Sequence, residues 1–250
     1  MPLGGSPSYL CKFNDYTLPG YVQQESFDST MNIASHYGAY LDGSHSEETG
    51  LGNKPLSVSL KVWEQDYLTC KDQVELAGTM LRSSRSGFKP LYLQYSDRHY
   101  EALVKSVKTD KTAGTSVRTL DYGVDFECRP WLIGDTLRTL TGTTLLDTNS
   151  VTRTIANGGW TPSTITVTGT NVTVSGYTAT GDFAGYFSSA GAVSNLVVNT
   201  DAFTATIGGA NQNALMNTVD YRLYVGPGRT YYAITGASAA TLTYYDRWLL

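Results

Sequence analysis

Alternation between apolar and polar residues is the clearest pattern in the first half of this 250-residue chain. From Leu120 to Cys128 every second residue is apolar, which predicts a strand with one buried face and one face toward water. Residues 58–62 alternate in the same way. Residues 91–95 and 100–107 flank a turn at residues 96–97, so they predict a β-hairpin.

One segment of the first half has helical spacing instead. Its apolar residues recur at steps of three and four, so they share one face of a helix. Asp66 or Thr69 can cap the start of this helix, and Gly87 follows its end. The predicted buried face consists of Tyr67, Cys70, Val74, Ala77 and Leu81.

The second half predicts many short strands and no helix of useful length. Gly169-Thr170-Asn171 is predicted to be a turn between strands at 165–167 and 172–174. Strands at this spacing favour an all-β sandwich or jelly roll, the architecture of galectins and carbohydrate-binding modules. Further strands are predicted at 196–198, 203–207, 221–225, 232–234 and 242–248.

Composition divides the chain near residues 139–149. Every Cys, His, Lys and Glu lies before Thr141, whereas Thr rises from 11 in residues 1–140 to 22 in residues 141–250. A single mixed core would not sort residue types in this way. We therefore predict two domains, 1–140 and 141–250, with Thr139–Asn149 as a linker or crossing strand. The first is expected to be a β-sandwich-like domain with one helix.

Charge argues against nucleic acid as a partner. The formal net charge is −4, and the sequence has no basic run. The nearest to one is Lys105, Lys108 and Lys111, and the negative charge of Asp110 lies among them. No stretch approaches ~18 consecutive apolar residues, so no membrane insertion is expected. The first residues lack a basic start followed by an apolar run, so no signal peptide is predicted.

The cysteines are predicted to be reduced and buried. Cys11, Cys70 and Cys128 are odd in number, far apart in sequence and outside any CxxC spacing. Such residues usually act as small apolar side chains.

Catalytic motifs are missing from the sequence. It contains no GxSxG, Walker loop, GxGxxG after a strand, or HExxH. His36 and His45 flank a polar loop near Glu47 and Glu48, but their spacing matches no metal-ligand motif, and a solvated hairpin tip is the preferred interpretation. We therefore predict no catalytic residues, no metal site, no cofactor and no enzymatic activity.

Aromatic residues in the second half leave a carbohydrate-binding role open as an alternative. Sugar-binding sandwiches present Trp or Tyr rings to the C–H face of a sugar. Trp160, Tyr177 and Tyr186 are the candidate stacking residues, with Tyr224 also available. Core or interface packing explains the same residues equally simply.

Three passages resemble the distal tail proteins of siphophages. Phe13 to Val22 looks like the opening strand of that family. The predicted helix, Lys89 to Leu93 and Asp125 to Trp131 resemble its helix and its long strand, which ends in a polar–Phe–polar–Cys–x–Pro turn. The C-terminal passages that resemble the family are residues 155–162, 196–200, 225–229 and 243–249.

The resemblance implies a structural protein of the virion tail tip that is made and assembled in the host cytoplasm. Its N-terminal domains would form a ring, expected to be a homohexamer, between the tail tube and the tail hub, fibre or receptor-binding protein. An N-terminal arm that crosses to a neighbour would contain Phe13, Tyr16, Pro19 and Tyr21. The second half carries no long insertion resembling an added receptor-binding module, which argues against direct binding of host sugars.

Overall fold

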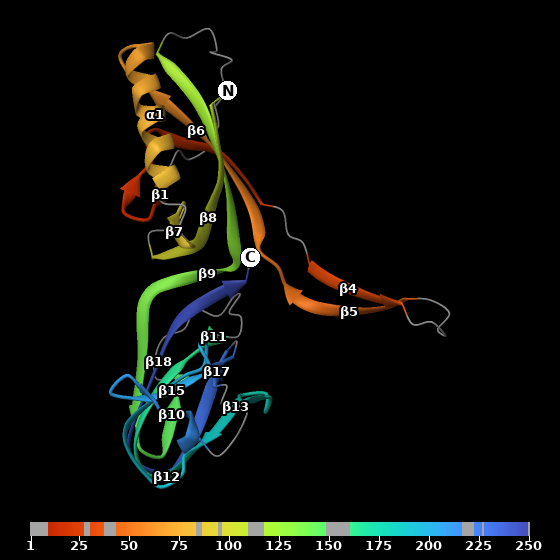
Figure 1. The fold of residues 1–250 in the computed structure, drawn as a ribbon, viewed down its shortest axis with the longest axis vertical. Helices are drawn as coiled ribbons and strands as arrows, with labels where there is room; N and C mark the ends of the chain where they lie inside the picture. Colours follow the sequence, from red (N-terminus) through yellow and green to blue (C-terminus); the bar gives the residue numbers. More distant parts are fainter. Residues whose placement is uncertain are drawn as a thin grey trace, which may run out of the picture. The chain divides into compact units, whose positions relative to one another are not determined.

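The protein is mainly β, with one α-helix among the residues described by the computed structural model (Figure 1). These residues are 10–27, 31–37, 44–83, 87–94, 97–109, 118–148, 161–216, 223–226 and 228–249. The chain divides into two compact units, Met1–Leu132 with Leu250, and Ile133–Leu249. The division between Leu132 and Ile133 falls inside one long strand, β9 (Thr119–Gly142). The predicted linker, Thr139–Asn149, begins in the same strand. That the units are independent domains stays a prediction.

The first unit is organised around the pairing of β6 (Lys54–Trp63) with β9. The antiparallel register is uninterrupted from Lys54↔Cys128 to Trp63↔Thr119. Buried residues therefore face buried residues, as in Leu56↔Phe126 and Val58↔Val124. The predicted alternation of this strand is confirmed, and so is that of residues 58–62.

The remaining strands of the first unit extend this sheet on both sides. The hairpin predicted around residues 96–97 is confirmed, because β7 and β8 pair antiparallel. β3 pairs with the free side of β6, and β1 pairs with β7. The bounds are β1 (Lys12–Phe13), β2 (Tyr16–Thr17), β3 (Tyr21–Phe27), β7 (Lys89–Tyr92) and β8 (Arg98–Thr109).

Helix α1 (Tyr67–Ser83) packs on this sheet and confirms the predicted helix. Asp66 caps it, since its carboxylate accepts hydrogen bonds from the Thr69 backbone N–H (2.9 Å) and hydroxyl (3.0 Å). Cys70, Val74, Ala77 and Leu81 are buried as predicted. Tyr67 is not, because it is the first helical residue and lies a turn before this buried stretch.

Strands β4 (Met31–Tyr37) and β5 (Ser44–Leu51) form a two-stranded antiparallel sheet of their own. The register runs from Met31↔Leu51 to Tyr37↔Ser44, with one irregularity between Asn32 and Ile33.

The second unit is built around β12 (Thr164–Thr178) and β18 (Thr230–Leu249), which pair along most of their length. Its core is formed by alternating residues of these and neighbouring strands, including Ile165, Val174 and Leu242. The other bounds are β10 (Leu145–Asp147), β11 (Thr161–Pro162), β13 (Phe183–Ser188), β14 (Ala192–Asn199), β15 (Thr204–Ile207), β16 (Ala210–Asn211), β17 (Tyr224–Val225) and a 3₁₀ turn, η2 (Asn213–Leu215).

The predicted turn at residues 169–171 is wrong. Strand β12 continues through it with a shift of register, and β18 follows on the neighbouring side. A Cβ on Gly169 would lie 2.1 Å from the carbonyl oxygen of Gly236, so the two backbones cross closely. The Gly and Asn signals therefore mark a bulge, which bends a strand without reversing it.

No helix among the described residues is long and apolar enough to span a membrane.

Gly20 provides a test of how tightly the N-terminal segment packs on the sheet. Its φ is +86°, and a Cβ there would lie 2.3 Å from the carbonyl oxygen of Lys61 on β6. Gly87 has a similar φ of +78° but open space around it. Gly87→Ala should lower the free energy of unfolding by about 1 kcal/mol, the cost of a left-handed conformation, and Gly20→Ala by more, because backbone must also move.

Denaturant unfolding of the full chain, followed by tryptophan fluorescence, measures both variants. Equal losses in the two variants would contradict the close approach of Gly20 to β6.

Candidate interaction surfaces

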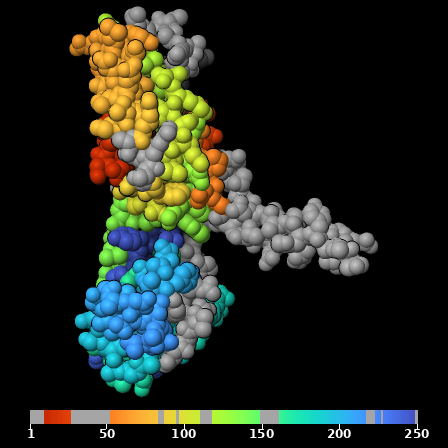
Figure 2. Space-filling view, in the orientation of Figure 1, coloured from red at the N-terminus to blue at the C-terminus, as the bar shows by residue number. Residues whose placement is uncertain are grey.

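Large apolar side chains are exposed on one part of the first unit. Helix α1 and the end of β6 carry most of them, and Figure 2 shows this region in orange to yellow. Leu76 and Met80 are separated by one helical turn, so they share a side of α1 that is distinct from its buried face. The exposed fractions are 68% for Trp63, 69% for Leu68, 47% for Leu76 and 41% for Met80. We name these four residues the α1 surface.

The N-terminal arm residues lie against their own unit. Phe13 is buried, and its ring centroid is 5.5 Å from that of Phe126. Phe13 therefore packs in the core of its own unit, and its predicted place in an interface arm stays a prediction. Pro19 is half-buried, and its carbonyl accepts a hydrogen bond from the Tyr122 hydroxyl (2.8 Å). Tyr16 and Tyr21 are also half-buried, and a role for them between subunits stays a prediction.

The predicted wet face of β9 carries a cluster of charged and polar residues. Asp125 accepts hydrogen bonds from Ser106 (2.6 Å) and Ser57 (2.8 Å) and forms an ion pair with Lys108. These contacts, led by the one from Lys108, hold the pKa of Asp125 below its usual range. Glu127 is held in the same way by Lys105 and Asn53, and its pKa is also lowered.

This cluster lines a shallow, open hollow and has its charges paired within the sheet. Groups of three or more His, Cys, Asp or Glu side chains that could hold a metal are absent from the described residues. The arrangement serves to order the wet face, since cross-strand pairs of opposite charge stabilise a sheet.

The cysteines are free and buried, as predicted. Burial raises the pKa of the Cys128 thiol to about 12, with the nearby Glu127 carboxylate adding to the effect. Burial likewise raises the pKa of Cys11. A thiol that resists ionisation is a poor nucleophile, so these residues act as small core side chains.

Aromatic residues form a patch on one face of β13, β12 and β18 in the second unit. The Tyr177 ring centroid is 6.0 Å from that of Phe183 and 5.9 Å from that of Tyr231. Tyr186 lies opposite Ser175, two residues before Tyr177, and therefore on the same face. We name Tyr177, Phe183, Tyr186 and Tyr231 the aromatic patch.

Exposure within the aromatic patch is uneven. Phe183 is 54% exposed, whereas the three tyrosines are half-buried. The patch contains two of the three predicted stacking residues. The third, Trp160, lies outside the described residues. Sequence reasoning missed Phe183 and Tyr231, because only the register of β12 with its neighbours brings them beside Tyr177.

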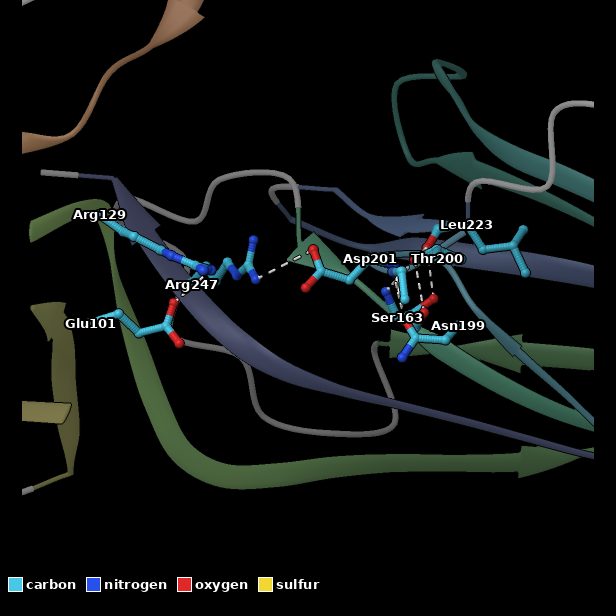
Figure 3. Close-up of polar contacts among 9 residues, drawn as sticks. Glu101, Arg129, Ser163, Asn199, Thr200, Asp201, Leu223 and Arg247 are labelled. Atoms are coloured by element: carbon cyan, nitrogen blue, oxygen red, sulfur yellow. Dashed lines mark hydrogen bonds and ion pairs between the residues drawn. The ribbon is translucent and has the colours of Figure 1, made fainter. Parts of the chain in front are cut away.

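Buried polar contacts tie three segments of the second unit together, as Figure 3 shows. The Ser163 hydroxyl donates to the carbonyl of Leu223 (2.7 Å), and the Thr200 hydroxyl donates to the carbonyl of Ser163 (2.8 Å). The Ser163 N–H donates to the Thr200 hydroxyl oxygen (2.9 Å). The Thr-rich composition of this half therefore serves in part to satisfy backbone groups inside the fold.

A known phage protein shares this architecture along the whole chain. The Dit protein of phage SPP1, described as a hub adsorption apparatus in phages that infect Gram-positive hosts, superposes with a TM-score of 0.71 at 14% identity. The match covers 96% of this chain and 99% of that one. This chain has the fold of a siphophage distal tail protein. The resemblance noted in the sequence is confirmed at the level of fold.

Other comparisons are weaker or negative. A chain of the phage P2 baseplate in its activated conformation matches with a TM-score of 0.42 at 11% identity, over 94% of this chain and 90% of that one. No protein-family model and no curated protein sequence matches.

The lowered pKa of Asp125 predicts an acid-dependent loss of stability. A carboxylate whose folded pKa is depressed stabilises the fold above its unfolded pKa of about 4, and this contribution disappears as the pH falls through the lowered value. Asp125→Asn should therefore unfold at lower denaturant concentration than the wild type at pH ~7, with the difference shrinking toward pH ~3.

The matched control for this experiment is Asp15→Asn, which changes a carboxylate in the exposed turn between β1 and β2. A difference between Asp125→Asn and wild type that is the same at both pH values would contradict a stabilising role for the ionised Asp125.

Proposed function

We propose that this chain is a structural component of a phage tail tip that assembles into a ring. The ring, expected to contain six copies, joins the tail tube to the tail hub, fibre or receptor-binding protein. The single observation that carries this proposal is the shared fold with a phage hub adsorption protein over nearly the full length of both chains. Its place is the virion tail tip, after synthesis and assembly in the host cytoplasm.

The α1 surface supports assembly. Four large apolar side chains on one helix and the adjacent strand end leave apolar area in contact with water, which is the usual mark of an interaction surface. A second copy of the chain is the occupant that a closed ring supplies, and closure gives every copy the same contact. The half-buried Tyr16, Pro19 and Tyr21 offer further contact area on the same unit.

The proposal assigns no catalytic role. The charged side chains of the β9 wet face are paired with one another in an open hollow, and the thiols of Cys11 and Cys128 have raised pKa values. Neither set has the features of an activated nucleophile or a general acid. A non-enzymatic role remains a prediction that follows from the proposed function.

Ring formation can be tested through the α1 surface. Light scattering after size exclusion, with negative-stain images, should show the wild type as a ring. Leu76→Glu should dissociate it into smaller species, because a carboxylate would be placed in an apolar contact. Gln23→Glu, which adds the same charge at an exposed position of β3 away from α1, is the control and should leave the ring intact.

Circular dichroism of each variant confirms that the helix persists. A wild type that stays monomeric at high concentration would refute the ring. A ring that persists in Leu76→Glu would instead show that the α1 surface is not part of the interface between copies.

Carbohydrate binding is a second candidate function, favoured by the aromatic patch. Tyr177, Phe183, Tyr186 and Tyr231 lie on one sheet face, and ring faces stack on apolar sugar faces as they stack on other flat ligands. In this role the chain would contact glycans of the host surface as well as other tail proteins.

A glycan array with the full chain tests this candidate. Tyr177→Ala should weaken any binding by about fivefold, since one aromatic contact contributes about 1 kcal/mol. Tyr245→Ala removes an exposed tyrosine from β18 outside the aromatic patch and serves as the control. Trp160→Ala tests the third predicted stacking residue. Binding that is absent, or equally weakened by Tyr177→Ala and Tyr245→Ala, would exclude the aromatic patch as a sugar site.

A further inference from the structure

One face of the second unit carries a row of side chains that crosses β13, β12, β18 and β10. Tyr177 on β12 is directly opposite Phe183 on one side and Tyr231 on the other. Tyr231 is in turn directly opposite Asp147 on β10. Directly opposite residues of a sheet share a face, so the row runs Phe183, Tyr177, Tyr231 and Asp147. The aromatic patch therefore ends beside a charged residue.

A bulge in β13 brings Phe183 into this row. Gly176 pairs with Gly185 and Tyr177 pairs with Phe183, so Ala184 is an extra residue on β13. Gly185 has a φ of +126°, a conformation that glycine adopts readily because it lacks a Cβ. Ala184 is 2% exposed and Phe183 is 54% exposed. The bulge therefore buries Ala184 and turns Phe183 outward beside Tyr177.

Arg229 and Asp147 form a bidentate ion pair at the other end of the row. The guanidinium donates from Nε to Oδ1 (3.0 Å) and from Nη2 to Oδ2 (2.6 Å) of Asp147. These bonds raise the pKa of Arg229, and the nearby Tyr231 contributes to the same shift. The Arg229 side chain is 51% exposed, and a guanidinium has five N–H donors, of which Asp147 uses two. The pair therefore offers hydrogen-bond donors and acceptors next to the Tyr231 ring.

The charges along the row favour a ligand that carries no net charge. The bidentate pair is neutral as a unit, and Asp182, which precedes Phe183, adds an exposed carboxylate at the far end. An acidic ligand would meet two carboxylates and one guanidinium, and the guanidinium is already compensated. Sugar hydroxyl groups, in contrast, can both donate to Asp147 and accept from Arg229.

We propose that the aromatic patch and the Asp147–Arg229 pair together bind a neutral saccharide. The rings of Phe183, Tyr177 and Tyr231 stack on the C–H faces of the sugar, and the ion pair binds its hydroxyl groups. The rings supply contact area, and the pair supplies specificity because its polar groups reject a ligand that leaves them unpaired. This inference rests on the carbohydrate-binding candidate function and is independent of ring formation.

Binding of the full chain to matched glycans tests the site. The array holds neutral gluco- and galacto-oligosaccharides, each beside the same chain ending in a uronic acid. The wild type should bind the neutral members more tightly than their acidic counterparts. Asp147→Ala/Arg229→Ala, which removes both charges together, should weaken binding of the neutral members by at least about tenfold, since hydrogen bonds to charged groups are strong. The control Asp201→Ala/Arg247→Ala removes another ion pair of the second unit (Figure 3) and should leave binding unchanged.

A single isosteric change tests the charge argument separately. Asp147→Asn keeps an acceptor for Arg229 but leaves the guanidinium charge uncompensated. The affinity for acidic members, relative to neutral ones, should therefore rise by about two- to fivefold, the effect of one exposed charge pair.

The outcomes separate this inference from the candidate function on which it rests. Absence of all glycan binding would remove carbohydrate binding and this inference together. Neutral glycans that bind equally to the wild type and to Asp147→Ala/Arg229→Ala, equal losses in the two double variants, or a wild type that prefers acidic glycans would overturn only this inference. Thermal unfolding checks that each variant is folded. If Asp147→Ala/Arg229→Ala does not fold, an unchanged preference in Asp147→Asn overturns the inference.

Discussion

The antiparallel ladder between β6 and β9 is the constraint on which the first unit depends. Its register is uninterrupted, so apolar residues of one strand meet apolar residues of the other on one face, as in Leu60↔Tyr122. The same register brings Lys61 opposite Asp121 on the other face, where their charges pair. A slip of one residue would turn every core side chain toward water. The helix, the β7–β8 hairpin and the N-terminal segment are all added to this ladder.

The two units solve the problem of strand edges and exposed faces differently. The first covers its sheet with α1 and orders the opposite face with ion pairs around Asp125 and Glu127. The second uses Thr, Ser and Asn side chains to satisfy backbone groups inside the fold, as at Ser163 and Thr200. Each still leaves aromatic or aliphatic side chains exposed. In the proposed assembly, neighbouring molecules would cover this apolar area.

Short sequence patterns predicted individual helices and strands more reliably than they predicted where the chain turns between strands. The Asp66 cap and the three-and-four spacing of Cys70, Val74, Ala77 and Leu81 act within one helix, so the helix was predictable. The signals at residues 169–171 were misleading, because Gly and Asn permit a turn and a bulge equally well. Only the continued pairing with β18, and the approach of Gly169 to Gly236, selects the bulge.

The sequence by itself determined the alternation of residues 58–62 and 120–128, the spacing of helix α1, the two-part composition, the burial of the cysteines and the lack of familiar catalytic motifs. These properties depend on residue type and on spacing along the chain. The tertiary structure alone decided which residues become neighbours in space. It places Phe13 against Phe126, Phe183 and Tyr231 beside Tyr177, and His36 opposite His45 in the strand register. The physical reason is that strand register is a long-range choice, set by the packing of whole faces and not by any short stretch of residues.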